Sequence, residues 1–204
     1  MAGCSYFRTG RLNGGEGNFL VRSRQLFADK GLMAVVVDAP SDRLRAPFLN
    51  GFRQTEEHAA DLKATIAWAR VTAKVPVWLV GTSRGTQSAA YAATVLQGAD
   101  APDGVVLTAT ILTDDKQRPV PAMPLEQIKV PVLVVHHQQD GCSYCAYSEI
   151  PNLMAKLTHT PRSHLITATG GKNQGDACAA FAHHGFNGLE ADVVGQMADW
   201  ILAP

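Results

Sequence analysis

The chain has 204 residues, of which 46% are hydrophobic and 18% are charged, and this composition excludes an intrinsically disordered protein. Lys and Arg together number 18, as do Asp and Glu, so no net field would attract nucleic acid or an anionic membrane. No apolar run approaches the roughly 20 residues that cross a bilayer, and the N-terminus lacks the pattern of an export signal. We therefore expect one domain over residues 1–204, with neither nucleic acid nor membrane as a partner.

In chain order, the apolar pattern alternates between helices and strands. Residues 18–30 predict a helix that Asn18 caps and Gly31 ends, and the apolar run 32–37 predicts a strand buried on both faces. A long helix is expected to open at residues 55–57, where two acidic residues suit its first turn. The other expected elements are strands at 76–80, 105–110, 130–136 and 163–168, helices at 84–97, 149–157 and 189–201, and an irregular excursion at 113–129.

This alternation predicts an α/β protein with a mainly parallel sheet that helices cover on both faces, in a three-layer α/β/α sandwich. Ligands of such sheets bind beyond the carboxyl ends of the strands. Ser83, Asp140 and the loop before the last helix all follow expected strands at that end. We expect the functional site there.

Ser83 lies in a Gly-x-Ser-x-Gly motif, between an apolar run and an alanine-rich segment. This strand–turn–helix context is the one in which the motif carries a nucleophile. Glycines on both sides let the backbone turn tightly, so the hydroxyl can stand exposed at the end of the strand. The free N–H groups of the following helix face any negative charge that develops there. The pattern favours a nucleophilic serine, and a purely structural turn is the alternative.

A serine hydroxyl becomes a good nucleophile when a base within hydrogen-bond reach takes its proton. Histidine, with an ordinary pKa of about 6.5, suits that role, and a carboxylate behind it fixes its tautomer. Ser83, Asp140 and His184 occur in this order, each after an expected strand. We predict them as nucleophile, acid and base.

Other residues compete for the acid and the base. Asp114 and Asp115 follow the preceding strand and are alternative acids, and His183 is the alternative base. His136 and His137 leave a strand on opposite faces, so at most one of them can face the site. We expect both of these histidines to be structural.

Three segments together resemble an α/β-hydrolase: Gly-Thr-Ser-Arg-Gly at 81–85, the strand that leads to Asp140, and His-Gly-Phe at 184–186. The resemblance runs from about Gly14 to the C-terminus and is greatest to small bacterial esterase-like and dienelactone-hydrolase-like members. It implies a carboxylesterase-like serine hydrolase that cleaves small-molecule esters through a Ser-His-Asp triad and an acyl-enzyme, without cofactor or metal. A peptidase, a thioesterase, a lactone hydrolase and a catalytically silent binding module remain alternatives.

The resemblance also implies an oxyanion hole and a substrate pocket. The backbone N–H of Arg84 would donate together with one from the glycine loop 13–17, where Gly15 or Glu16 is the donor. Residues 38–54 and 113–129 would line the pocket. An apolar lining, or else ordinary packing, is expected for Phe48, Leu49, Phe52 and Met123.

The chain departs from this family at its front. Related hydrolases have several strands before the glycine loop, whereas residues 4–7 are the sole strand candidate there in this sequence. That run could fill the gap, a partner chain could fill it, or the sequence could be a truncated form. N-terminal strands are therefore expected to be reduced or missing, and a homo-oligomer stays open.

Three cysteines lie close to the predicted acid and base. Cys142 and Cys145 form a C-x-x-C, which neither begins a helix after a strand, as a redox motif would, nor has the second ligand pair of a structural zinc site. We expect a Cys142–Cys178 disulfide, because it would tie the acid loop to the histidine loop. An oxidised pair would favour a periplasmic or secreted protein, and the compartment itself stays open.

Overall fold

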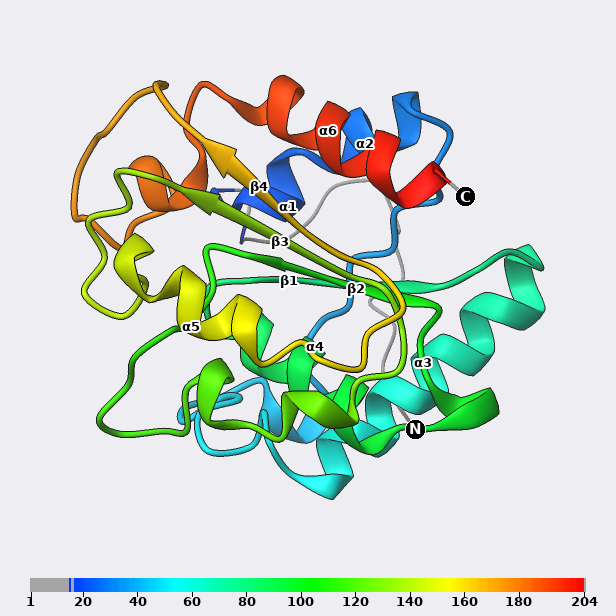
Figure 1. Cartoon of the computed structure of the whole chain (residues 1–204). Coiled ribbons are helices and arrows are strands. Elements are labelled where there is room, and N and C mark those ends of the chain that lie inside the picture. Colours follow the sequence, from blue (N-terminus) through cyan, green and yellow to red (C-terminus); the bar gives the residue numbers. More distant parts are fainter. Residues whose placement is uncertain (1–14, 16, 204) are drawn as a thin grey trace.

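The computed structural model describes residue 15 and residues 17–203 (Figure 1). The helices of this part are α1 (Phe19–Arg22), α2 (Arg24–Asp29), α3 (Glu56–Ala73), α4 (Arg84–Val95), α5 (Ile150–Ala155) and α6 (Glu190–Leu202). The strands are β1 (Trp78–Thr82), β2 (Gly104–Thr108), β3 (Val132–His137) and β4 (Ser163–Ala168). Within the described residues, no helix combines the length and apolar character needed to cross a membrane.

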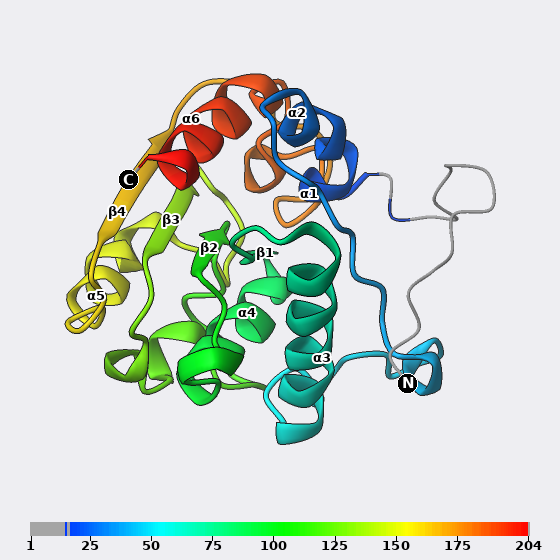
Figure 2. The ribbon, with the colours of Figure 1, turned by 90° about the vertical axis from the view of Figure 1, so that its right-hand side faces the viewer.

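The strands form one parallel sheet in the order β1-β2-β3-β4. In its register Val80 pairs with Val106, and Val106 with Leu133. Helices α1, α2 and α6 cover one face of the sheet, and α3, α4 and α5 lie on the other side (Figure 2). The predicted three-layer α/β/α sandwich is therefore confirmed, as is the predicted alternation of strands and helices from residue 55 onward.

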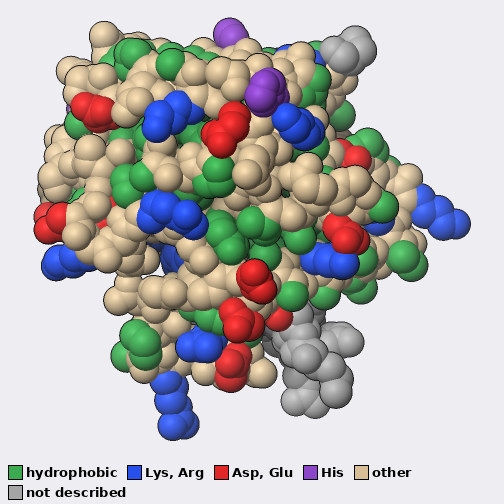
Figure 3. Space-filling view, turned by 60° about the horizontal axis from the view of Figure 1, so that its bottom comes forward, with side chains coloured by type: hydrophobic (Ala, Val, Ile, Leu, Met, Phe, Trp, Pro, Cys, Tyr) green, Lys and Arg blue, Asp and Glu red, His purple; other side chains and the backbone are tan. Residues whose placement is uncertain are grey.

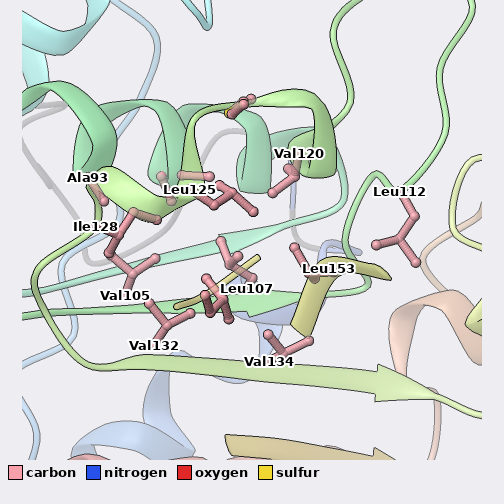
Figure 4. Close-up of a cluster of buried hydrophobic side chains, with 14 of the residues drawn as sticks. Ala93, Val105, Leu107, Leu112, Val120, Leu125, Ile128, Val132, Val134 and Leu153 are labelled. Carbon is pink, nitrogen blue, oxygen red and sulfur yellow. The ribbon is translucent and has the colours of Figure 1, made fainter. Parts of the chain in front are cut away.

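The two central strands are buried along their whole length, which explains their continuous apolar sequences. Successive side chains of a strand point to opposite faces, so each of these strands supplies two cores. One core lies between the sheet and helices α4 and α5; it includes Ala93, Leu107, Val120, Leu125, Val134 and Leu153 (Figure 4). The other lies beneath α1, α2 and α6; it includes Phe19, Val106, Leu133, Val135, Phe186 and Met197.

The expected strand over residues 32–37 is wrong. This run has no regular secondary structure, and Met33 and Val37 are 52% and 53% exposed. β1 ends the described sheet, and no described strand lies beside the run to complete a ladder with it. Without a ladder partner the backbone groups must stay in contact with water. The strand candidate at the front of the chain, residues 4–7, lies outside the described residues.

The expected helix over residues 18–30 is interrupted at Ser23. Asn18 caps the first part as predicted, because its side chain accepts a hydrogen bond of 3.0 Å from the N–H of Leu20. Ser23, with φ of −91° and ψ of 0°, then separates α1 from α2. Ser23 is fully buried, and its hydroxyl has no hydrogen-bond partner among the described residues. The break directs α1 toward the loops at the carboxyl ends of the strands.

The surface carries charges of both signs. On the face shown in Figure 3, the side chains of Lys and Arg are interspersed with those of Asp and Glu. This distribution agrees with the zero formal net charge of the sequence.

Candidate active site

Ser83 occupies a sharp turn between the end of β1 at Thr82 and the start of α4 at Arg84. Its φ of +50° and ψ of −125° lie in a region that residues with a side chain rarely adopt. The turn is held on both sides: the N–H of Ser83 donates to the carbonyl of Thr108 at 3.0 Å, and its carbonyl accepts from the N–H of Thr86 at 2.9 Å. The local geometry is the strand–turn–helix arrangement that the motif predicts.

The two glycines of the motif have different roles. A Cβ atom on Gly81 would lie 2.5 Å from the carbonyl oxygen of Gly85, so only glycine fits at that position. A Cβ atom on Gly85 would meet no other atom within 4 Å. The close approach of β1 to the first turn of α4 therefore requires the first glycine, while the second occupies open space.

The N–H of Arg84 lies in the first turn of α4, where a helix leaves its N–H groups without partners inside the helix. This is the backbone position that the sequence analysis predicted as an oxyanion donor. The side chain of Arg84 turns away to form an ion pair with Asp114, and its guanidinium lies 4.9 Å from the ring centre of Tyr144. The alternative acid Asp114 is thus engaged with an arginine.

Asp140 and His184 are in contact. Nδ1 of His184 lies 2.9 Å from Oδ2 of Asp140, in a buried environment where the aspartate side chain is 0% and the histidine 4% exposed. The other carboxylate oxygen accepts from the N–H of Cys142 at 2.9 Å. Asp140 follows β3, and His184 belongs to a short 3-10 turn, His183–Gly185, before α6.

The glycine after His184 allows this turn to pack closely. A Cβ atom on Gly185 would lie 1.9 Å from the carbonyl oxygen of Ala180, so a larger residue would force the histidine turn open. The next residue, Phe186, adopts φ of +56° and is fully buried against Phe19, with 4.8 Å between the ring centres. The His-Gly-Phe pattern thus reflects one compact turn.

The other histidines make different contacts. His183 stacks on His137 with 4.3 Å between ring centres, and its Nδ1 lies 3.2 Å from the carbonyl of Gln139. His136 is fully buried, with Nε2 2.7 Å from the carbonyl of Cys145 and 3.6 Å from Oδ2 of Asp140. Of the two candidate bases, His184 is therefore the one in contact with Asp140, and His136 packs beside the same carboxylate.

Two electrostatic features surround these groups. Burial lowers the pKa of His136, more strongly than its contacts with Cys145 and Asp140 raise it, so His136 is neutral at physiological pH. Burial alone would raise the pKa of Asp114, but hydrogen bonds from the N–H of Lys116 and from Arg84 lower it, so Asp114 is charged. The positive charge of Arg84 is consequently balanced.

The structure does not join every predicted site residue. Nε2 of His184 is buried and has no hydrogen-bond partner in the described part of the chain, and the hydroxyl of Ser83 makes no hydrogen bond to a described residue. Gly15 is exposed, with φ of +69°, and its carbonyl accepts from the N–H of Asn18. Glu16 lies outside the described residues. A contact of the glycine loop with Ser83 stays a prediction.

Arg22 links residue 17 near the start of the chain to the histidine turn before α6. Nothing in the sequence singled out this arginine. Its guanidinium donates to the carbonyls of Gly17 and Gly185, and its Nε lies 2.9 Å from Glu190. The end of the glycine loop and the histidine turn are therefore held together by one side chain. No local motif marks this arginine, because its partners are backbone groups distant in sequence.

The predicted pocket segments meet in a hollow of about 240 Å³ that Gly51, Gln54, Gln117 and Arg118 line. Three of these four residues have polar side chains. Of the residues expected as an apolar lining, Phe52 and Met123 are only 8% and 3% exposed and belong to the packed interior. Ordinary packing, the alternative that the sequence left open, describes them.

The predicted disulfide is confirmed: Cys142 and Cys178 are bonded, with 4.5 Å between their Cα atoms. Cys145 is a buried free thiol. Among the described residues, Cys142, Cys145 and His184 also form a group whose metal-binding atoms all lie within 4.8 Å of one another.

Comparisons with known proteins show the fold. No family model matches the sequence, and no curated protein matches it. Solved structures do. A cold-adapted esterase from an Arctic intertidal metagenomic library is 15% identical, with 88% of this chain and 75% of that one covered and a TM-score of 0.58. The chain has an α/β-hydrolase fold.

Two further structures support this assignment. A putative alpha/beta hydrolase from Agrobacterium tumefaciens is 17% identical, with 93% of this chain and 78% of that one covered and a TM-score of 0.58. An a/b serine hydrolase without lid from Xanthomonas campestris is 18% identical, with coverages of 94% and 78% and a TM-score of 0.54. The α/β-hydrolase fold that the motifs predicted is thereby confirmed.

Proposed function

We propose that this chain is a serine hydrolase that cleaves small-molecule carboxylic esters through Ser83, His184 and Asp140. The contact of 2.9 Å between His184 and Asp140, buried in an α/β-hydrolase fold whose elbow carries Ser83, is the observation that supports it most. The esterase and serine hydrolase among the structural neighbours support the same class of reaction.

The tautomer of His184 follows from its partners. An ionised carboxylate only accepts hydrogen bonds, so Nδ1 of His184 carries the proton that it shares with Asp140, and Nε2 carries a lone pair. Nε2 is buried and has no partner among the described residues. A buried acceptor without a donor is costly, which favours a hydroxyl donor such as that of Ser83 at this nitrogen during the reaction.

The reaction then proceeds in two halves. Ser83 Oγ attacks the ester carbonyl while Nε2 of His184 takes its proton, and the imidazolium is stabilised by Asp140. N–H groups of Arg84 and Gly15 bind the oxyanion, and His184 protonates the departing alcohol to leave an acyl-enzyme. Water, deprotonated by His184, hydrolyses that intermediate. These steps use no cofactor and no metal.

Covalent labelling tests the proposal directly. A fluorophosphonate probe should add once to the wild-type protein, as measured by intact mass, and Ser83→Ala should abolish the adduct. His184→Ala should slow both labelling and the hydrolysis of a panel of esters by at least about 10³-fold. His183→Asn is the matched control, since His183 contacts His137 and the Gln139 carbonyl. Labelling of the folded Ser83→Ala protein at the wild-type rate would refute the assignment of the nucleophile.

A further inference from the structure

The C-x-x-C of the acid loop and the histidine of the predicted triad lie in one buried cluster. The metal-binding atoms of Cys142, Cys145 and His184 are within 4.8 Å of one another, and all three residues are buried. Cys142 and Cys145 belong to the loop after β3, whereas His184 belongs to the turn before α6. Two thiol positions and one imidazole are a ligand set that zinc prefers.

Nε2 of His184 and the thiol of Cys145 make no strong hydrogen bond to a described residue. Nε2 of His184 is buried without a hydrogen-bond partner in the described part of the chain. The thiol of Cys145 makes one weak contact, 3.5 Å to the carbonyl of Ala109. Burial, and then the charge of Asp140, raise the pKa of that thiol, so without a cation it is protonated and inert. Only the bond from Cys142 to Cys178 keeps the third group occupied.

We propose that reduction of the Cys142–Cys178 disulfide creates a zinc site formed by Cys142, Cys145 and His184. A dithiol reductant supplies two electrons and two protons and becomes a disulfide, while Cys142 and Cys178 become thiols. Zinc then displaces one proton from Cys142 and one from Cys145 and accepts the lone pair of Nε2. Cys178 is released and takes no part in the site.

The geometry requires little movement. With bonds of about 2.3 Å to sulfur and about 2.0 Å to nitrogen, tetrahedral ligands lie roughly 3.3–3.8 Å apart. Before the disulfide is opened, one ring nitrogen of His184 and the sulfurs of Cys142 and Cys145 lie within 4.8 Å of one another, at most about 1.5 Å beyond that spacing. Asp140 already accepts the Nδ1 proton of His184, which is the arrangement that orients a zinc-bound imidazole through its far nitrogen.

Zinc at this site competes with catalysis for one atom. The proposed hydrolysis needs the Nε2 lone pair, and the metal holds that same lone pair. The reduced, zinc-loaded protein is therefore inactive, while the disulfide-bonded protein excludes zinc and stays active. This inhibition rests on the proposed function, whereas the binding of metal does not.

Cobalt, a spectroscopic probe of zinc sites, tests the binding without an activity assay. All proteins carry Cys4→Ser, because Cys4 lies outside the described residues. Adding Cys178→Ala leaves Cys142 a free thiol without any reductant. Co²⁺ titrated into this variant should give one bound ion per chain, with the visible absorption of tetrahedral cobalt and a thiolate charge-transfer band in the near ultraviolet. The disulfide-bonded protein should give neither band.

The matched controls separate ligand loss from unfolding. Adding Cys145→Ser or Cys145→Ala to the Cys178→Ala protein should weaken zinc binding by at least about 100-fold, since one of three protein ligands is lost. The thiolate band per bound cobalt should fall to about half, because Cys142 is then the single thiolate ligand. Serine keeps a donor for the Ala109 carbonyl, and circular dichroism verifies the fold of each variant. Unchanged cobalt spectra in both Cys145 variants, or no thiolate band in Cys178→Ala, would overturn the proposed site.

Ester hydrolysis forms the second arm. Zinc should inhibit the Cys178→Ala protein at least 10-fold relative to its own metal-free rate, and the disulfide-bonded protein much less. Thiolate bands in a protein that hydrolyses no ester would uphold the metal site and reject the proposed function. Thiolate bands with undiminished hydrolysis would uphold the site and reject His184 as the base.

Discussion

Gly81 and Gly85 flank the same serine under different constraints, and this separates two substitutions that look alike in the sequence. Gly81→Ala places a methyl group 2.5 Å from the Gly85 carbonyl and should lower the free energy of unfolding by about 1–3 kcal/mol. Gly85→Ala meets open space within α4 and should leave stability unchanged or raise it by about 0.5–1 kcal/mol. Urea unfolding followed by tryptophan fluorescence measures both, and equal losses would contradict the geometry.

His58 should make the free energy of unfolding depend on pH. It is 6% exposed and neither ring nitrogen has a partner among the described residues, while burial, and next the charge of Arg53, lower its pKa. The unfolded chain, with a histidine pKa of about 6.5, therefore binds a proton more readily than the folded one. Stability from this residue is complete above about pH 6.5 and is lost as the pH falls toward the lowered folded value.

The substitution His58→Leu removes that contribution. Urea unfolding at pH 7.5 and at pH 5 measures this contribution. Between these two pH values, the free energy of unfolding should fall less for His58→Leu than for the wild-type protein. The dependence will not vanish, since burial also lowers the pKa values of His136 and His137. Identical losses in the two proteins would show that His58 is not the group that titrates.

The sequence predicted that Asp140 and His184 act together. Asp140 follows an apolar strand, and His184 directly precedes a glycine, so local patterns single out both residues. They favoured Asp140 as the acid but did not exclude Asp114, which also follows a strand. That choice depends on side chains from other elements: Arg84 pairs with Asp114, whereas His184 contacts Asp140. Arg22, whose partners are carbonyl oxygens, had no signal to detect.

At the scale of elements, α1 and the histidine turn are joined by Arg22, and this joint should influence catalysis. Arg22→Met removes the hydrogen bonds to the Gly17 and Gly185 carbonyls together with the ion pair to Glu190. Misplacement of a catalytic group by about 1 Å costs up to 10²-fold, so kcat should fall roughly 10- to 100-fold while KM changes little.

Two comparison variants make this prediction specific. Arg22→Lys keeps the charge and should recover part of kcat. Arg24→Met, on the adjacent helix, removes only a hydrogen bond to the carbonyl of Val21 and should have a small effect. A fall in stability with unchanged kcat in Arg22→Met would assign Arg22 a purely structural role.

The prediction of a strand at residues 32–37 was wrong because an apolar pattern does not show whether a neighbouring strand is present. Residues 105–110 and 32–37 have similar apolar runs, yet the first contains most of the buried strand β2 and the second is largely exposed. A run of β-branched residues indicates that a strand is favoured, but a strand also needs a neighbour to bond to. β2 has β1 and β3, and no described strand accompanies residues 32–37.

At the scale of the whole molecule, the three-layer arrangement follows from general rules of α/β folds and was predicted, whereas no strand order was predicted. Parallel strands joined by helices give helices on both faces and put the site at the carboxyl ends. The sequence predicted which two segments form the hollow between residues 51–54 and 117–118, but not which of their side chains line it. The residues that line it, Gly51, Gln54, Gln117 and Arg118, are not those expected as an apolar lining.

The position of β1 at one end of the described sheet has a consequence for backbone dynamics. β2 and β3 each have a strand on both sides, whereas β1 is bonded only to β2 within that sheet. Amide hydrogens of β1 should therefore exchange with deuterium at least about 10-fold faster than those of β3, as measured by mass spectrometry of peptides. Equal exchange rates would contradict this order. The strand that leads to Ser83 should then open before β2 and β3 on heating, and ester hydrolysis should be lost before the β2–β3 core unfolds.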